Sequence, residues 1–598
     1  MSIEQKKYKN YLRWLSHHLF RQKYLVFCVI VGIIFVTYTR TLIPLILGEM
    51  TYTIPSMSTA SEIIPLIFVA LSIYVLNIVL DYGSMMVGHF LGLRVERNMR
   101  TEFFDIIQSK SLKYHDSART GDLQALATYD LRIVNTMISH GAFYIYPFIQ
   151  VFIVIIVLFN NLDIRLALFF LPFLILYCYF ILYYRKKLAP FVRARMKKHS
   201  NIATTLQDNI SGAKVIKLYT TEKVERNRFQ SAVQAFRDNW IGENKVQSKY
   251  YPLLILYLSI STLFSISSFF VYFQTLTVEE LAAINLLLIT LIDPTNLIFW
   301  ATNDMMSGFA ACSRVFDALS KGESEDMNSH SEVSFKKLQG KIEFKNISFS
   351  YEDQNKKSTR VFENLNFVIQ PLQKVALVGP TGCGKTTLAK IILSLYRPQD
   401  GCIYIDDLEI SKYPLEILRK RVGYIEQDIY LFPRSIRENI SFGNPDASDR
   451  EIREAAQLAQ VDDFVKDFPD GYDTIVGERG TKLSGGERQR IAIARALLTD
   501  PDIIILDDSV SAVDSETEEK IGKAIENVLQ KRTTIIITHR LNAIRTADKI
   551  LVLKDGGIIA QGDHQDLLRR SEDYRRIFGR FLPLPDIEVR KSINQRGN

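Results

Sequence analysis

Six apolar runs in the first 300 residues limit what this chain can fold into more than any other feature. The runs cover residues 24–48, 63–90, 142–160, 164–184, 251–274 and 281–300. Each is about 20 residues long or longer, which is the length that an α-helix needs to cross the hydrocarbon core of a bilayer. One such run can be a buried core helix, but six without polar alternation predict transmembrane helices.

Positive charge is distributed unevenly among the segments that connect these runs. Residues 91–140 carry seven Lys and Arg and residues 185–250 carry fifteen, whereas residues 49–62, 161–163 and 275–280 carry none. Because basic connections stay on the cytoplasmic side, we expect both long segments and the basic N-terminus to be cytoplasmic. The first run is too long for a cleavable signal. The sequence therefore predicts a multi-pass protein of a bacterial-type cell membrane.

The two long basic segments mix charged and apolar residues at helical spacing, with glycine-containing interruptions at residues 119–123 and 211–214. This pattern predicts that the transmembrane helices continue into the cytoplasm and that each pair closes over a short transverse turn. Plain loops are the alternative. The five cysteines are scattered without a CxxC pair, which argues against a disulfide framework or a zinc site.

The second half contains a motif with a defined chemistry. Residues 379–386 read GPTGCGKT, after an apolar strand and before a helix, as in phosphate-binding loops. Glycines let backbone N–H groups point at phosphate oxygens, while Lys385 would neutralise the β- and γ-phosphates and Thr386 would bind Mg²⁺. Cys383 is interpreted as a small spacer. The motif predicts binding of ATP with Mg²⁺.

Two further motifs lie downstream of this loop. A buried-type strand at residues 503–506 ends in Asp507, a candidate Mg²⁺ ligand, and the next residue, Asp508, would face the attacking water. Residues 484–486 read Ser-Gly-Gly directly before a helix, and a helix N-terminus offers N–H groups to an anion. For these three residues alone, an ordinary turn is the alternative.

In this order, the motifs resemble the nucleotide-binding domain of ATP-binding cassette (ABC) transporters over about residues 340–581. The match comprises Walker A (379–386), the glutamine loop around Gln427, the signature (483–487), Walker B (503–507), the aspartate loop (511–514) and the switch histidine. The resemblance implies catalytic roles for Asp508, His539 and Gln427, and Mg²⁺ ligation by Thr386, Gln427 and Asp507. It implies nucleotide contacts by Tyr351, Gly379, Pro380, Thr381, Gly382, Cys383, Gly384, Lys385, Thr386, Thr387, Ser484, Gly485 and Gly486.

The first half is similar to the same family, in the form of a type IV exporter half-transporter. The implied fold is an all-α six-helix transmembrane domain with long cytoplasmic extensions (residues 1–318), a linker (319–339), an α/β P-loop ABC nucleotide-binding domain (340–582) and a basic tail (583–598). The resemblance implies an ATPase-coupled exporter with a second half-transporter as partner. Its substrate would be a drug-like small molecule, a lipid or a peptide, and the six spans exclude a soluble ATPase that acts on nucleic acid.

Two positions depart from the family pattern. Members that hydrolyse ATP well have Glu after the Walker B aspartate, where this chain has Asp508. A base must approach its water to about 3 Å, and one CH₂ fewer withdraws the carboxylate by about 1.5 Å. With Asp at position 508, the chain therefore resembles the degenerate subunit of heterodimeric exporters. A slow homodimer and an ATP-gated channel or regulator are the alternatives. The second departure is Glu487 in place of Gln.

Two charged residues interrupt the apolar runs, Arg40 in the first and Asp293 in the sixth. Charges inside a membrane are costly and face a cavity or a partner. Asp293 precedes Pro294, so the sequence predicts a kink there. A structural pair within the bundle and a contact to substrate both remain open for these two residues.

Overall fold

The computed structural model describes residues 10–56, 60–161, 164–249, 253–273, 277–325, 337–352, 358–507 and 531–578. The chain forms two compact units. Unit 1 comprises residues 1–110 and 118–324, and unit 2 comprises residues 111–117 and 325–598. Each unit is described by itself.

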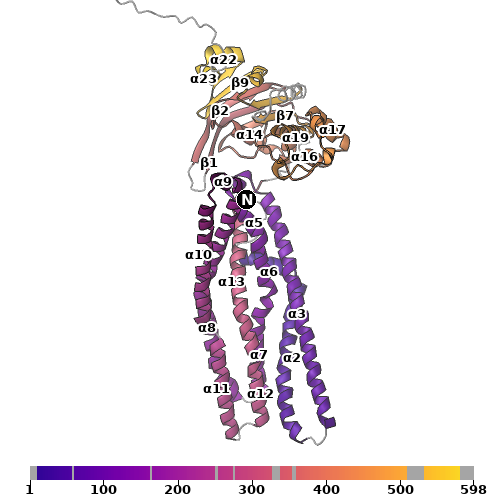
Figure 1. Cartoon of the computed structure of the whole chain (residues 1–598), viewed down its shortest axis with the longest axis vertical. Helices are drawn as coiled ribbons and strands as arrows, with labels where there is room; N and C mark the ends of the chain where they lie inside the picture. The colour runs from indigo at the N-terminus through magenta and orange to yellow at the C-terminus, as the bar shows by residue number, and fades with distance from the viewer. Residues whose placement is uncertain are drawn as a thin grey trace, which may run out of the picture. The chain divides into compact units, whose positions relative to one another are not determined.

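Unit 1 is helical and consists mainly of long helices that lie alongside one another (Figure 1). The six predicted runs fall in α2, α3, α7, α8, α11 and the pair α12–α13. The helices of unit 1 are α1 (Tyr11–Phe20), α2 (Lys23–Ser56), α3 (Ala60–Gln108), α5 (Thr120–Ala125), the π-helical turn η1 (Leu126–Asp130), α6 (Leu131–Ser139), α7 (Gly141–Asn161), α8 (Ile164–Ser211), α9 (Ala213–Tyr219), α10 (Glu222–Lys249), α11 (Leu253–Tyr272), α12 (Val278–Ile289) and α13 (Ile292–Ser320).

The apolar surface of these helices is divided between a core and an exposed face. Val95 and Met99 of α3, Val134 of α6 and Val315 of α13 are buried together in one cluster. Within the described residues, two stretches are long and apolar enough to cross a membrane, Lys23–Gly48 and Ile64–Gln108. Shorter apolar helices cover Ile145–Val157, Ile260–Tyr272 and Glu280–Ile289.

The sixth predicted span is broken. Helix α12 ends at Ile289 and α13 begins at Ile292, so Pro294 lies in the first turn of α13. Proline is tolerated there because its missing N–H has no partner within the helix in any case. The side chain of Asp293 lies outside the described residues. Arg40 of α2 donates a hydrogen bond from Nη1 to the hydroxyl of Tyr146 of α7 at 2.6 Å, which joins two helices of unit 1.

Unit 2 is an α/β domain built on two sheets. The larger sheet has the strand order β10-β9-β3-β8-β7-β6, and the smaller antiparallel sheet has the order β2-β1-β4-β5. The two units have the predicted architecture, an all-α domain followed by an α/β domain. The strands are β1 (Ile342–Glu352), β2 (Ser358–Ile369), β3 (Lys374–Val378), β4 (Asp400–Ile405), β5 (Leu408–Glu409), β6 (Val422–Ile425), β7 (Ile503–Asp507), β8 (Thr533–Ile537), β9 (Lys549–Lys554) and β10 (Gly557–Gly562).

The helices of unit 2 pack into three hydrophobic cores. Helix α14 (Lys385–Ile392) contributes Leu388 and Ile391 to the core between the two sheets. Helix α19 (Gly485–Leu497) contributes Ile491 to a second core. The remaining helices are α15 (Leu415–Arg421), η2 (Ile410–Lys412), α16 (Ile436–Ser441), α17 (Asp449–Leu458), α18 (Asp462–Val465), η3 (Gly471–Asp473), η4 (Glu478–Gly480), α21 (Leu541–Arg545), α22 (His564–Arg570) and α23 (Glu572–Phe578).

Unit 2 also contains a short helix from the first basic segment. Helix α4 (Leu112–Ser117) lies between α3 and α5 in the sequence, and its residues belong to unit 2. Leu112 packs against the core between the sheets. The hydroxyl of Tyr396 donates a hydrogen bond to the Asp116 carboxylate. Burial and this carboxylate both raise the pKa of Tyr396, so the phenol keeps its proton and remains a donor.

Candidate functional site

The sequence motifs gather at one edge of the larger sheet because its central strands are parallel. Strands β3, β8, β7 and β6 pair in parallel, so their carboxyl ends lie at the same edge, where open α/β sheets bind ligands. The phosphate loop follows β3 and Asp507 ends β7. His539 lies two residues beyond β8, and Gln427 lies two residues beyond β6. The fold therefore brings together four predicted elements that are far apart in the sequence.

The phosphate loop needs glycine for steric reasons. Gly382 and Gly384 have φ of +82° and +103°, in the left-handed region that side chains rarely adopt. A Cβ on Gly384 would also lie 2.7 Å from the Phe362 ring. The ammonium of Lys385, the first residue of α14, donates to the carbonyl oxygens of Gly379 at 2.9 Å and Pro380 at 3.0 Å. The lysine is thus held across the loop, at the N-terminus of the following helix.

Cys383 is half-buried inside the loop. Burial raises the pKa of its thiol, and the nearby Lys385 only partly opposes that shift. Because the thiolate is the reactive form of cysteine, the environment of Cys383 disfavours nucleophilic chemistry. This agrees with its interpretation as a spacer.

Tyr351, the predicted adenine-stacking residue, lies on β1 beside α14. Its hydroxyl is 3.2 Å from Oγ1 of Thr387, in the first turn of that helix. Its ring packs edge-on against Phe349 and Tyr396, with centroids 4.9 Å and 5.2 Å away. Tyr351 is therefore fixed at both ends and half-buried next to the phosphate loop.

Asp507 is buried, with 1% of its surface exposed. Tyr424 of β6 donates a hydrogen bond to Oδ2 of Asp507 at 3.2 Å, and burial together with this negative charge raises the pKa of Tyr424. Burial also raises the pKa of the neighbouring Glu426. Sequence reasoning missed Tyr424, although it lies in the glutamine loop, because the pairing of β6 with β7 cannot be inferred from the motif.

The signature begins a helix that a different core supports. Ser484 is the N-cap of α19, and its Oγ accepts the N–H of Glu487 at 3.3 Å. The Glu487 carboxylate in turn accepts the N–H of Ser484 at 2.7 Å. This capping box stabilises the helix start and gives the unusual Glu487 a structural role. Ser484 is exposed, so the N-terminus of α19 faces solvent.

Several predicted residues have no detailed placement. Asp508 and the aspartate loop at residues 511–514 lie outside the described residues. Thr381, Gln427 and His539 are exposed in unit 2. In the part of the chain that the structure describes, no group of three or more His, Cys, Asp or Glu side chains could hold a metal ion by itself.

Comparison with known proteins gives two family matches. Residues 26–295 match the ABC transporter transmembrane region, and residues 362–511 match the ABC transporter family. An uncharacterized ABC transporter ATP-binding protein of Bacillus subtilis, YwjA, is 34% identical over 85% of this chain and 88% of its own length. An ATP-dependent lipid A-core flippase of Syntrophus aciditrophicus is 31% identical over 83% of this chain and 82% of its own length.

The fold is similar to that of a solved exporter. A structure described as a bacterial Atm1-family ABC exporter with ATP bound superimposes with a TM-score of 0.85 and 27% sequence identity. The similarity covers 95% of this chain and 99% of that protein. It therefore includes both the helical part and the α/β part.

Proposed function

The chain belongs to the ABC transporter family as an ATPase-coupled exporter half-transporter, and from that premise we propose that it exports a lipid-like or drug-like substrate as the degenerate-site subunit of a heterodimer. The observation that carries the ATP-driven export in this proposal is the convergence of the phosphate loop, Asp507, Gln427 and His539 at one sheet edge, in a chain that also has a transmembrane region. Relatives include proteins named as a lipid A-core flippase and a putative multidrug exporter.

We assign the nucleotide contacts to residues that surround the phosphate loop. Tyr351 stacks on the adenine, while Lys385 exchanges its bonds to the Gly379 and Pro380 carbonyls for bonds to phosphate oxygens. The N–H groups of the loop and of α14 complete the cradle. This exchange is favourable because ammonium–phosphate hydrogen bonds are charge-assisted.

Mg²⁺ would bind here together with the nucleotide. Asp507 fits this role, because it ends β7 at the same edge of the sheet as the phosphate loop and its carboxylate is a ligand that this cation prefers. Thr386 would supply a hydroxyl and Gln427 an amide oxygen. Hydroxyl, amide and carboxylate oxygens are ligands that Mg²⁺ accepts. The metal would neutralise charge on the β- and γ-phosphates.

Asp508 and the position of the signature support the proposed heterodimer. Helices α14 and α19 belong to different cores, and α19 presents its N-terminus to solvent. We propose that Ser484–Gly486 complete the ATP site of a second half-transporter, whose own signature covers this chain's phosphate loop. That partner would carry Glu where this chain has Asp508. The N-terminus and the ATP-binding domain would lie on the cytoplasmic side of the cell membrane.

Purification from native membranes tests the assembly. The tagged chain should co-purify with a different half-transporter that has Glu after its Walker B aspartate. Inside-out vesicles that contain the pair should accumulate substrate only with hydrolysable ATP. Recovery of this chain only with copies of itself would contradict the heterodimer, and ion flux that persists with a non-hydrolysable analogue would favour the channel alternative.

A further inference from the structure

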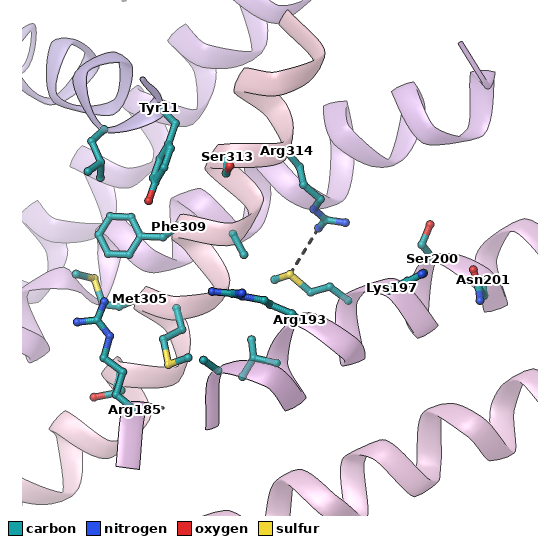
Figure 2. Close-up of a pocket in the computed structure, with 17 residues that line it drawn as sticks. Tyr11, Arg185, Arg193, Lys197, Ser200, Asn201, Met305, Phe309, Ser313 and Arg314 are labelled. Carbon is teal, nitrogen blue, oxygen red and sulfur yellow. Dashed lines mark hydrogen bonds between the residues drawn. The ribbon is translucent and has the colours of Figure 1, made fainter. Parts of the chain in front are cut away.

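Unit 1 contains a cavity of about 960 Å³ between α1, α8 and α13 (Figure 2). This volume is in the range of pockets that hold drug-sized ligands. On α8 the lining begins at Arg185, the first residue after the fourth predicted span, and extends through Arg193 and Lys197 to Asn201. The polar wall therefore lies in the predicted cytoplasmic extension, where a charged group need not enter hydrocarbon.

The cavity has an excess of positive charge. Arg185, Arg193, Lys197 and Arg314 line it, and none of its lining residues is acidic. Arg314 is compensated, because its Nη2 donates to Asp130 at 2.7 Å. Arg185, Arg193 and Lys197 are exposed and have no hydrogen-bond or ion-pair partner among the described residues. Within the part of the chain that the structure describes, these three positive charges are therefore uncompensated.

The spacing of these cations makes the arrangement costly without a ligand. Arg193 and Lys197 are four residues apart on one helix, where like charges repel, and Arg185 lies eight residues before Arg193 on the same helix and also lines the cavity. A multivalent anion between them would remove this repulsion and form charge-assisted hydrogen bonds. Packing does not explain why Arg185, Arg193 and Lys197 are cations, because none of these three side chains is buried.

The opposite wall, on α13, includes apolar side chains. Met305 and Phe309 of α13 line the cavity, and Figure 2 shows Arg193 of α8 extending toward them, with Tyr11 of α1 nearby. Methionine side chains are flexible and polarizable, so they pack against ligands of varied shape. The two walls together suit a molecule with an anionic end and an apolar body.

We propose that this cavity is the cytoplasmic loading site of the exporter and that its substrate is an amphipathic anion, whose charged group binds Arg185, Arg193 and Lys197 while its apolar part packs on Met305 and Phe309. The inference rests on the proposed export function and specifies its substrate class. The anion can come from an anionic membrane lipid or from a soluble amphiphile, and the two sources share this chemistry.

Binding without ATP tests the site separately from transport. The purified complex in phosphatidylcholine nanodiscs is titrated with 1-oleoyl lysophosphatidate and with 1-naphthyl phosphate. Each is compared with a counterpart that has no net negative charge, zwitterionic lysophosphatidylcholine for the first and uncharged 1-naphthol for the second. Binding of the anionic member of at least one pair supports the proposal. Preference for lysophosphatidate assigns a lipid source, and preference for naphthyl phosphate assigns a soluble one. Equal binding within both pairs overturns it.

Variants of α8 locate the binding. The double variant Arg193→Gln/Lys197→Gln should bind the preferred anion at least about tenfold more weakly, whereas Arg193→Lys should retain most of the affinity because the charge remains. Lys186→Gln is the matched control, since it removes an exposed cation of the same helix that does not line the cavity. Equal losses in the double variant and in Lys186→Gln would overturn the site. Normal binding with no ATP-driven accumulation would instead contradict the proposed export function.

Discussion

Replacing Asp130 by Asn should change how the stability of unit 1 depends on pH. Asp130 is 2% exposed in η1, and Oδ2 of its carboxylate is buried without a hydrogen-bond partner among the described residues. Burial raises the pKa of Asp130 from 3.8 to about 6, and Arg314 opposes this shift only in part. The folded protein therefore binds this proton more tightly than the unfolded chain does.

The sign and size of the effect follow from linkage. An acid with a raised pKa in the folded state stabilises the fold at low pH, and this contribution is lost as the pH rises from about 4 through about 6. With pKa values of 3.8 unfolded and about 6 folded, the free energy of unfolding should fall by about 1.3 kcal/mol between pH 5 and pH 7. The Asp130→Asn variant should not show this fall in the free energy of unfolding, because the Asn side chain does not titrate.

Tryptophan fluorescence is a suitable assay because Trp14, Trp240 and Trp300 are the chain's only tryptophans and all lie in unit 1. Denaturant titrations at pH 5 and pH 7 compare the parent with Asp130→Asn. Asp122→Asn is the control, since Asp122 is an exposed carboxylate on α5. The control should follow the parent. If Asp130→Asn also shows the parent's full pH dependence, the reasoning about burial is refuted.

Three further substitutions test the ATP-binding unit. Lys385→Ala should weaken binding of a fluorescent ATP analogue by at least about tenfold, because phosphate charge loses its cation; unchanged affinity would contradict the placement of the phosphate loop. Tyr396→Phe removes the bond to Asp116 and should lower substrate-stimulated ATPase activity while ATP affinity stays within about twofold, since the ring against Tyr351 remains. Glu487→Gln should preserve the helix cap, because Gln also accepts the N–H, and should raise the ATPase rate by removing a negative charge beside the γ-phosphate; a lower rate would argue against that repulsion.

The sequence predicts those features that depend on neighbouring residues. Apolar runs of membrane length and the GPTGCGKT loop are local patterns, so the fold class could be predicted from them. The hydrogen bond between Arg314 and Asp130 joins residues 184 positions apart, and no local pattern specifies it. The same holds for Tyr424 and Asp507, which meet because β6 pairs with β7. The cavity depends on three helices that are distant in sequence, so its charge could not be predicted from the basic segments alone.

Helix ends also differ from the sequence expectation. The connection predicted at residues 49–62 is largely helical, because α2 continues to Ser56 and α3 begins at Ala60. Helix α2 ends at Ser56, directly after Pro55, so loss of hydropathy marks the edge of the predicted apolar run and not the end of the helix.

Steady-state ATP hydrolysis by two variants of the purified complex tests the asymmetric pair most directly. Ser484→Arg blocks the N-terminus of α19, which in this account completes the competent site on the partner. Asp508→Asn alters only this chain's own weak site. In an asymmetric pair, Ser484→Arg should abolish most of the hydrolysis, while Asp508→Asn should leave most of it intact. Equal and near-complete loss in both variants would contradict the account and identify two equivalent sites in which Asp508 acts as the base.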